Sequence, residues 1–296
     1  MKPVDFTLHR PSTLTEALHL LAEYGDDAKV LAGGQSLIPL LNFRLARPEH
    51  LIDLSEVRQL ATLRRTRDEV ISGAMVTYRH AELSLAVTDA VPLLAAALPH
   101  VAHRPVRARG TIGGSIAHAD PAAELPAVVT ALDATIVASS VRGTRTIPAR
   151  QFFVSNLVTV LAADEILTEI RFPAAGPGAG AAFEEVSRRR GDFALVGAGA
   201  QVTVNEDGTL ARTQIALTGV AATPVRATAA EDLLTNAAPT PERLEQAAEA
   251  VRAAIDPSGD LHAPGEYRRH VAGTLVARTV AAAVRNATSR ALEDVG

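Results

Sequence analysis

The sequence predicts an α+β protein, and three observations support this class. Strand and helix patterns alternate over residues 1–56, both kinds of element are mixed over residues 57–174, and strands precede helices over residues 181–296. With 296 residues the chain has room for about two domains and a sizeable core. We therefore expect a small α/β unit, a second α+β unit and a separate C-terminal domain.

The first unit begins with a short strand at residues 5–8 and an amphipathic helix. Thr13 and Glu16 form a capping box before apolar residues at helical spacing, and Gly25 ends the helix. The other expected elements are a buried strand at residues 29–32, a brief helix at residues 37–45 and a strand at residues 50–54.

The second unit mixes strands and helices without a simple repeat. Its expected strands are residues 70–74, 134–138, 144–147 and 166–172, and its expected helices are residues 77–84, 92–98 and 125–132. The last strand alternates, with Ile166, Ile170 and Phe172 on one side and Glu169 and Arg171 on the other.

Pro and Gly dominate residues 173–180, which predicts a linker because these residues interrupt both helices and strands. Beyond it we expect three strands, at residues 182–186, 194–204 and 210–218, with a hairpin turn at residues 205–208. Two helices follow: one is capped by Thr240 and Pro241, and a long Ala-rich helix spans residues 267–292.

Composition excludes several functions. The formal net charge of −4 disfavours nucleic-acid binding, and the absence of Cys removes disulfides, thiolate nucleophiles and iron–sulfur clusters held by this chain. None of the nine His stands in a metal-ligand spacing, so no metal site is expected. Charge-free runs are too short for a membrane span, and the N-terminus lacks an apolar signal core, so we expect a cytoplasmic protein.

The first segment with candidate chemistry is Ala32-Gly33-Gly34-Gln35-Ser36, at the end of a predicted strand. Glycines let main-chain N–H groups approach an anion, and successive N–H groups in such a turn can hold phosphate oxygens. The alternative is an ordinary tight turn.

The second segment is Thr111-Ile112-Gly113-Gly114-Ser115, followed by Asp120 and Glu124. Two glycine loops would suit a diphosphate, and the carboxylates would accept hydrogen bonds from ligand hydroxyls. The alternative is a pair of surface turns, with Asp120 capping the next helix.

The third segment is Arg188-Arg189-Arg190-Gly191-Asp192-Phe193-Ala194. Phe193 is suited either to stack on a planar ring or to fill the core, and the arginines are expected to pair with Glu184 and Glu185. The sequence has neither a Rossmann glycine fingerprint nor a phosphate-binding P-loop.

In this order and spacing, the three segments resemble the FAD-binding medium subunit of molybdenum-containing hydroxylases, the family of carbon monoxide dehydrogenase flavoproteins and xanthine dehydrogenase FAD subunits. The resemblance covers essentially the whole chain, including Tyr267-Arg268 and Ala272-Gly273. It implies a PCMH-type, vanillyl-alcohol-oxidase-like FAD-binding fold of two lobes, with a C-terminal domain of a three-stranded antiparallel sheet and helices.

The same resemblance implies a noncovalently bound FAD and assigns residues to it. Its FAD-binding residues would be Lys29, Leu31, Ala32, Gly33, Gly34, Gln35, Ser36 and Leu37 at the first loop, Thr111, Gly114, Ser115 and Ala117 at the second, and Asp120, Glu124, Ile166, Leu167 and Phe193 elsewhere. Two positions depart from the family pattern: Ser115 stands where relatives often have Asn, and Glu185 stands where some have a Lys near the flavin.

Since clusters are held mainly by Cys thiolates, a chain without Cys is expected to be only the flavin subunit. The resemblance implies a small [2Fe–2S] subunit and a large molybdenum-cofactor subunit as partners, in a dimer of heterotrimers, with electrons passing through FAD to an external acceptor. No acid–base catalytic residue is expected here. The alternatives are a self-contained flavoprotein oxidase or reductase and a scaffold that has lost its flavin; the substrate and the acceptor stay open.

Overall fold

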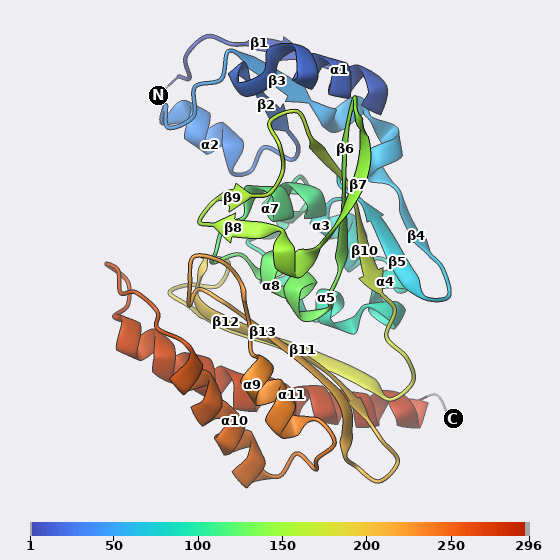
Figure 1. The fold of residues 1–296 in the computed structure, drawn as a ribbon, viewed down its shortest axis with the longest axis vertical. Helices are drawn as coiled ribbons and strands as arrows, with labels where there is room; N and C mark the ends of the chain where they lie inside the picture. Colours follow the sequence, from blue (N-terminus) through green and yellow to red (C-terminus); the bar gives the residue numbers. More distant parts are fainter. Residues whose placement is uncertain (1, 294–296) are drawn as a thin grey trace.

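The computed structural model describes residues 2–293 and arranges them in three parts along its long axis (Figure 1). The N-terminal lobe lies at one end, a central lobe follows, and the C-terminal sheet with its helices lies at the other end. Each part has its own hydrophobic cluster, although the largest cluster extends from the central lobe to Ala181 and Phe183 of the C-terminal sheet. The class is α+β, as expected.

The N-terminal lobe is a parallel three-stranded sheet in the order β1-β3-β2. Its elements are β1 (Thr7–His9), α1 (Leu14–Tyr24), β2 (Ala28–Leu31), α2 (Leu37–Asn42) and β3 (His50–Asp53). Thr13 caps α1 by accepting a hydrogen bond from the N–H of Glu16, and Gly25 ends it with a φ of 52°. The carboxylate of Glu16 accepts from the N–H of Ser12, one residue before the position that a capping box uses.

The central lobe is built on an antiparallel sheet in the order β4-β5-β10-β6-β7. Its strands are β4 (Leu63–Arg65), β5 (Glu69–Gly73), β6 (Thr135–Ser140), β7 (Gly143–Pro148) and β10 (Ile166–Pro173), with a small ribbon of β8 (Phe153–Ser155) and β9 (Val158–Thr159). Its helices are α3 (Tyr78–Glu82), α4 (Leu85–Ala90), α5 (Pro92–Ala97), α6 (Arg104–Arg107), α7 (Ile112–His118) and α8 (Glu124–Ala131).

The C-terminal part is an antiparallel sheet in the order β11-β12-β13-β14, with helices on one face (Figure 1). Its elements are β11 (Ala179–Ser187), β12 (Ala194–Val204), β13 (Leu210–Thr218), β14 (Val225–Arg226), α9 (Thr228–Leu234), α10 (Pro241–Ala254) and α11 (Gly265–Glu293). The three expected strands are present, and β14 adds a two-residue fourth. The linker is shorter than expected, because β11 begins at Ala179.

Hydrogen bonds join the C-terminal sheet to the central lobe. The hydroxyl of Thr218 on β13 donates to the carbonyl oxygens of Pro121 and Ala123, at 2.6 and 2.9 Å, and the side-chain amide of Gln214 donates to Ala131 at 2.8 Å. The N–H of Gly219 donates to Pro121 as well. The sheet therefore holds the segment that leads into α8.

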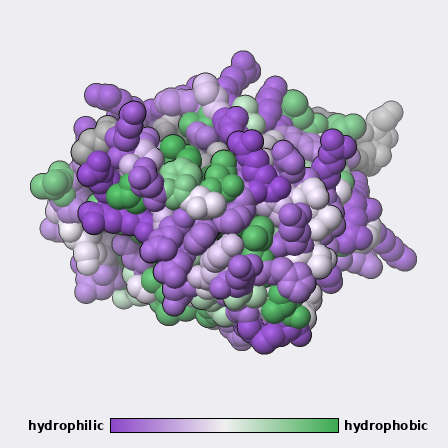
Figure 2. Space-filling model, turned by 90° about the horizontal axis from the view of Figure 1, so that it is seen from above, coloured by the Kyte–Doolittle hydropathy of each residue, from purple (hydrophilic) through white to green (hydrophobic). Residues whose placement is uncertain are grey.

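Although α11 is 29 residues long, no helix within residues 2–293 has a stretch apolar enough to cross a membrane. Seen from the N-terminal end (Figure 2), the surface is mostly hydrophilic, and its apolar side chains lie in small separate patches.

Arg268, near the start of α11, is 7% exposed and connects three segments through hydrogen bonds. Its guanidinium donates to the carbonyl oxygens of Leu195 and Gly219 and to the carboxylate of Asp260, at 2.6, 3.0 and 2.7 Å. Hydrogen bonds from a charged donor to otherwise unpaired buried carbonyls are among the stronger ones.

Arg268→Met is expected to lower the free energy of unfolding by about 3 kcal/mol, because it leaves these carbonyl oxygens without a donor. Arg278→Met is the matched control on the same helix: Arg278 is 65% exposed and pairs with Glu184, so its loss should cost at most about 1 kcal/mol. Urea unfolding of both variants measures the difference, and equal losses would contradict the role given to Arg268.

Candidate functional site

The two glycine segments, about eighty residues apart in the sequence, lie against each other. A Cβ on Gly33 would stand 2.2 Å from the carbonyl oxygen of Arg109 and 2.7 Å from the Cα of Gly110. A Cβ on Gly114 would stand 3.3 Å from the Cβ of Ala32. Backbone therefore packs on backbone at this contact, and residue 33 has no room for a side chain.

The first segment is an open turn between β2 and α2. Gly34 has a φ of +73°, and the side chain of Gln35 donates to the carbonyl oxygen of Gly33 at 3.0 Å. Within residues 2–293, the N–H groups of Gly33 to Ser36 donate no hydrogen bond. Successive free N–H groups in such a turn can hold an anion, and the phosphate-binding role of this segment stays a prediction.

The second segment differs from the open loop that we expected. It forms the first turn of α7, where Thr111 is only 2% exposed and accepts a hydrogen bond from the N–H of Gly114. The N–H groups of residues 112–115 already donate to Val76, Ala74 and Thr111. The expectation of an open loop is therefore wrong. The N–H groups that a phosphate would need already have acceptors, in the helix cap at Thr111 and in the neighbouring segment at Ala74 and Val76. Gly113 packs on Ala74, with an added Cβ only 2.5 Å from that of Ala74.

A charged cluster surrounds the end of α7. Burial lowers the pKa of His118, the nearby carboxylate of Asp120 opposes this shift, and the ammonium of Lys29 adds to it. The charges of Lys29, on β2 before the first segment, and of Asp120, after the second, thus both act on His118. Asp120 also accepts from the N–H of Ala122 at 2.9 Å and so forms a turn before α8. It does not cap that helix, whose N-cap is Ala123 with no side-chain hydrogen bond, so the capping role in the alternative is wrong.

Glu124 begins α8 and is 6% exposed. Burial raises the pKa of its carboxyl to about 7, its own N–H lowers it, and the charge of Glu185 raises it further. Nearby, burial raises the pKa of Tyr78 to about 12, against a hydrogen bond with the Ser115 side chain. The polar groups around the second segment are therefore held out of water.

The remaining candidate residues differ in how far they are exposed to solvent. Phe193 is 61% exposed, which excludes the core alternative, and its loop reaches the central lobe where Gly191 packs on the ring of His103. Ile166 and Leu167 begin β10, where they pair with β6, and they are buried in two different core clusters. Ala117 is exposed on α7.

The expected pairing of the arginines with Glu184 and Glu185 is wrong. Arg188 contacts His262, with Nη1 3.0 Å from Nδ1. Glu184 pairs with Arg278 of α11, whereas Glu185 lies on the other face of β11 near His100. Strand alternation explains the split, because neighbouring side chains point to opposite faces.

Sequence reasoning did not find the contact residues Ala74, Arg109 and Gly110, or the imidazole of His100. The signal available in the sequence was the glycine at position 110, directly before Thr111. A Cβ added there would lie 2.5 Å from the ring of Tyr78, so the close contact requires glycine. His100 carried no signal, because its contact with Glu185 joins elements far apart in the sequence.

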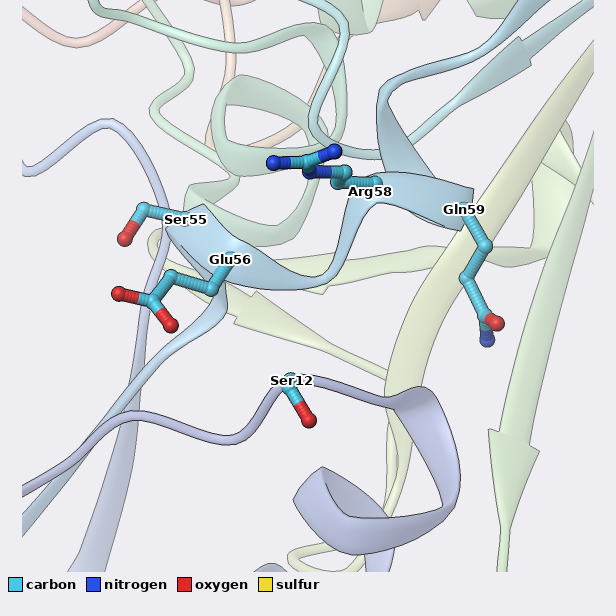
Figure 3. A pocket seen from close by; sticks show the side chains of 5 residues that line it. All are labelled: Ser12, Ser55, Glu56, Arg58 and Gln59. Carbon is cyan, nitrogen blue, oxygen red and sulfur yellow. The ribbon is translucent and has the colours of Figure 1, made fainter.

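A polar hollow of about 730 Å³ lies elsewhere, at the N-terminal lobe (Figure 3). Ser12 lines it from the segment before α1, and Ser55, Glu56, Arg58 and Gln59 line it from the two short turns after β3. None of the glycine-segment residues contributes to it. Within residues 2–293, no group of three His, Cys, Asp or Glu is placed to hold a metal ion.

The two lobes with their glycine contact, free main-chain donors and buried carboxyls are the architecture of an FAD-binding domain, here followed by a separate C-terminal sheet. Comparison with known proteins agrees. Residues 4–175 match the FAD binding domain in molybdopterin dehydrogenase, and residues 181–283 match the CO dehydrogenase flavoprotein C-terminal domain. The chain belongs to this family of FAD-binding medium subunits of molybdenum hydroxylases.

The relatives match almost end to end. The 6-hydroxypseudooxynicotine dehydrogenase complex subunit alpha of Paenarthrobacter nicotinovorans is 42% identical, over 97% of each chain. A structure of carbon monoxide dehydrogenase from Hydrogenophaga pseudoflava is 40% identical with a TM-score of 0.94, covering 97% of this chain and 99% of that one. Quinoline 2-oxidoreductase from Pseudomonas putida 86 has a TM-score of 0.92 at 36% identity, with 97% and 99% covered.

Family membership confirms the cofactor and the general class of activity. The chain is an oxidoreductase subunit that binds FAD, and the molybdenum cofactor and iron–sulfur clusters of such complexes belong to other subunits. It is therefore one component of a multi-subunit dehydrogenase.

Gly33→Ala is expected to lower the free energy of unfolding by about 2 kcal/mol, because its Cβ would collide with the rigid carbonyl of Arg109. Gly114→Ala should cost about 1 kcal/mol, since its nearest obstacles are the Thr111 hydroxyl at 2.8 Å and the Ala32 methyl group. Gly176→Ala, which meets nothing within 4 Å, is the control. Thermal unfolding ranks the three, and a Gly33 variant as stable as the control would refute the contact.

Glu124→Gln is expected to gain stability over the wild type as the pH rises. The carboxyl binds its proton more tightly in the folded chain, with a pKa of about 7 against an ordinary 4.5. The wild type therefore loses stability between about pH 4.5 and pH 7, by up to about 3 kcal/mol, and the loss is complete above that range. Urea unfolding of both proteins at several pH values measures it; parallel curves would show that Glu124 is not buried as described.

Proposed function

We propose that this chain is the electron-transfer subunit of its complex, passing electrons from the [2Fe–2S] clusters of a small partner subunit through FAD to an external acceptor. The FAD-binding domain and the dehydrogenase family support this role. FAD supplies the two-electron to one-electron conversion, and the protein supplies its position and electrostatic surroundings.

The observation that carries the proposal is the run of free N–H groups at Gly33 to Ser36, against the start of α7. These donors would hold the diphosphate, with Lys29 close enough to add positive charge. Around them we assign the first-loop residues Leu31, Ala32 and Leu37, then Gly114, Ser115, Ala117, Asp120 and Glu124, with Ile166, Leu167 and Phe193 toward the flavin. Thr111 would act indirectly, by fixing the turn.

This assignment also gives each domain of the chain a role. Residues 1–56 and 57–174 would form the two lobes of the FAD-binding domain, and residues 181–296 the C-terminal flavoprotein domain. We assign no acid–base catalyst, because the substrate would be oxidised on the large molybdenum subunit. The exposed side chain of Phe193 suits a cover over one face of the flavin ring.

The partners follow from chemistry and from the relatives. Because the chain has no Cys, the clusters must be held by another subunit. Several relatives are described as medium chains or medium subunits of dehydrogenases. We propose a small [2Fe–2S] subunit and a large molybdenum subunit, assembled as a dimer of heterotrimers.

The diphosphate site is tested by comparing FAD with riboflavin, which lacks the diphosphate and the adenosine attached to it. If the free N–H groups of Gly33 to Ser36 carry the affinity, FAD should bind the FAD-depleted chain at least about 100-fold more tightly, because two or three charge-assisted hydrogen bonds are lost with riboflavin. Quenching of flavin fluorescence measures both affinities, and equal values would contradict the assignment.

The electron-transfer role needs the complex. In stopped-flow mixing with the substrate of the complex, the flavin absorbance should bleach only when both partner subunits are present. Bleaching of the FAD-loaded chain alone would favour a self-contained oxidase or reductase instead.

A further inference from the structure

The loop of residues 188–193, which joins β11 to β12, contains a turn that requires glycine. The N–H of Asp192 donates to the carbonyl oxygen of Arg189 at 3.0 Å, and Gly191, the third residue of this turn, has a φ of +86°. A residue with a side chain is strained at that φ. Phe193 follows the turn, directly before β12, and is 61% exposed. The turn therefore determines where this exposed ring lies.

Gly191 packs against the imidazole of His103 in the central lobe. A Cβ on Gly191 would stand 2.4 Å from Cε1, 2.6 Å from Nδ1 and 2.9 Å from Nε2 of that ring. The imidazole therefore fills the place that a side chain at position 191 would take. Glycine is required there twice, by its φ and by the ring beside it.

The main chain that carries His103 is itself held in place. Arg107, buried in α6, donates from Nη1 to the carbonyl oxygens of Val101 and Ala102, at 3.0 Å each. Its N–H donates to the carbonyl oxygen of His103, also at 3.0 Å. Ala102 has a φ of +42°, which is uncommon for a residue with a side chain, and these hydrogen bonds stabilise it. Glu82 of α3 lies 3.5 Å from Nε of Arg107 and holds the guanidinium. His103 is thus a fixed support for Gly191.

The loop is anchored on its other side as well. Nη1 of Arg188 lies 3.0 Å from Nδ1 of His262, and the hydroxyl of Ser187 donates to the carbonyl oxygen of Arg189 at 2.9 Å. The backbone before Phe193 is therefore held at two places, whereas the ring itself is open to solvent. A large aromatic ring that is exposed on a held loop is preorganised to stack on a planar partner.

The segment that carries His103 also carries the contact to the first glycine turn. Arg109, six residues after His103, contributes the carbonyl oxygen against which Gly33 packs. Six residues span at most about 22 Å, and less here because α6 lies among them. One short segment thus supports the turn with free N–H groups at one end and the loop before Phe193 at the other. This spacing suits a ligand whose diphosphate meets the first and whose ring meets the second.

We propose that His103 is a positioning residue for Phe193: its imidazole supports the turn at Gly191 and so holds the Phe193 ring over the flavin. The inference rests on the proposed function, which assigns Phe193 to the flavin. Arg107 contributes indirectly, through the main chain of His103. The role of the imidazole is one of shape, because its contact with Gly191 is a packing contact.

The expected gain is one of preorganisation. If the loop had to become ordered when FAD binds, the free energy of ordering would be subtracted from that of stacking. A loop that is supported in advance loses less. Removing the imidazole should therefore weaken FAD binding, and only while Phe193 is present.

The contact is tested without FAD by limited proteolysis of the full chain with trypsin. Arg188, Arg189 and Arg190 are exposed, so cleavage after them reports how firmly the loop is held. His103→Ala should speed this cleavage at least about fivefold, because a loosened loop enters a protease more readily. His80→Ala, which removes an exposed imidazole from α3, is the matched control and should be cleaved like the wild type. Mass spectrometry of the fragments measures the rates.

Folding is checked with the same two variants. His103 lies at the surface, so His103→Ala should unfold at the same urea concentration as His80→Ala. Faster cleavage then reports the loop and not a destabilised chain.

The effect on FAD is measured as a double-mutant cycle in the FAD-depleted complex, by quenching of flavin fluorescence. Phe193→Ala should raise the Kd about tenfold, as expected for one aromatic stacking contact. His103→Ala should raise it about fivefold, the cost of ordering the loop on binding. The variant with both changes should match Phe193→Ala, since His103 acts only through Phe193. His80→Ala should bind FAD like the wild type.

The outcomes separate the two claims. A wild-type cleavage rate in His103→Ala overturns the support of the loop. A double variant whose Kd rises about fiftyfold, the product of the two single effects, overturns the positioning role. If Phe193→Ala leaves the Kd unchanged, the assignment of Phe193 under the proposed function fails, and the proteolysis still decides whether His103 supports the loop.

Discussion

The packing of Gly33 on the carbonyl of Arg109 is the constraint on which the rest of the site depends. It brings the end of β2 to the start of α7 with no side chain between them. The parallel sheet of the N-terminal lobe leads into this contact from one side and the central lobe from the other. The lobes also meet in the core cluster that packs Ile166 of β10 against α1. The free N–H groups of the first turn are held at the glycine contact as a consequence.

The two glycine segments look alike in sequence but have different physical roles. The turn at Gly33 to Ser36 leaves its donors free to bind an anionic ligand. The segment at Thr111 to Ser115 has satisfied its donors through helix capping and packs rigidly on Ala74. One segment is suited to bind and the other to support it, as is common where a rigid element positions a binding loop.

The sequence predicts much of this fold because long elements carry their own periodicity. The expected bounds of β12 and β13 agree with the structure, since alternation and the turn at residues 205–208 define them locally. The two-residue strands β9 and β14 were not expected, because only pairing with another strand defines them. For the site, the glycine pairs were visible, whereas the hydroxyl of Thr111 was interpreted as facing a ligand when it caps a helix.

The same reasoning explains why the electrostatics of the site escaped sequence analysis. The run Arg188 to Arg190 dominates the local sequence, yet these side chains are exposed, where water weakens their field. The group with the clear shift is Glu124, a single acid on an apolar helix, whose pKa is raised by burial; Thr218 of the C-terminal sheet holds the segment that leads into this helix. A charge acts more strongly on its neighbours when it is buried. A carboxyl at this junction therefore has a larger electrostatic effect than the arginine cluster on the surface. The C-terminal sheet acts on this carboxyl through structure, because its hydrogen bonds hold the segment from which Glu124 follows.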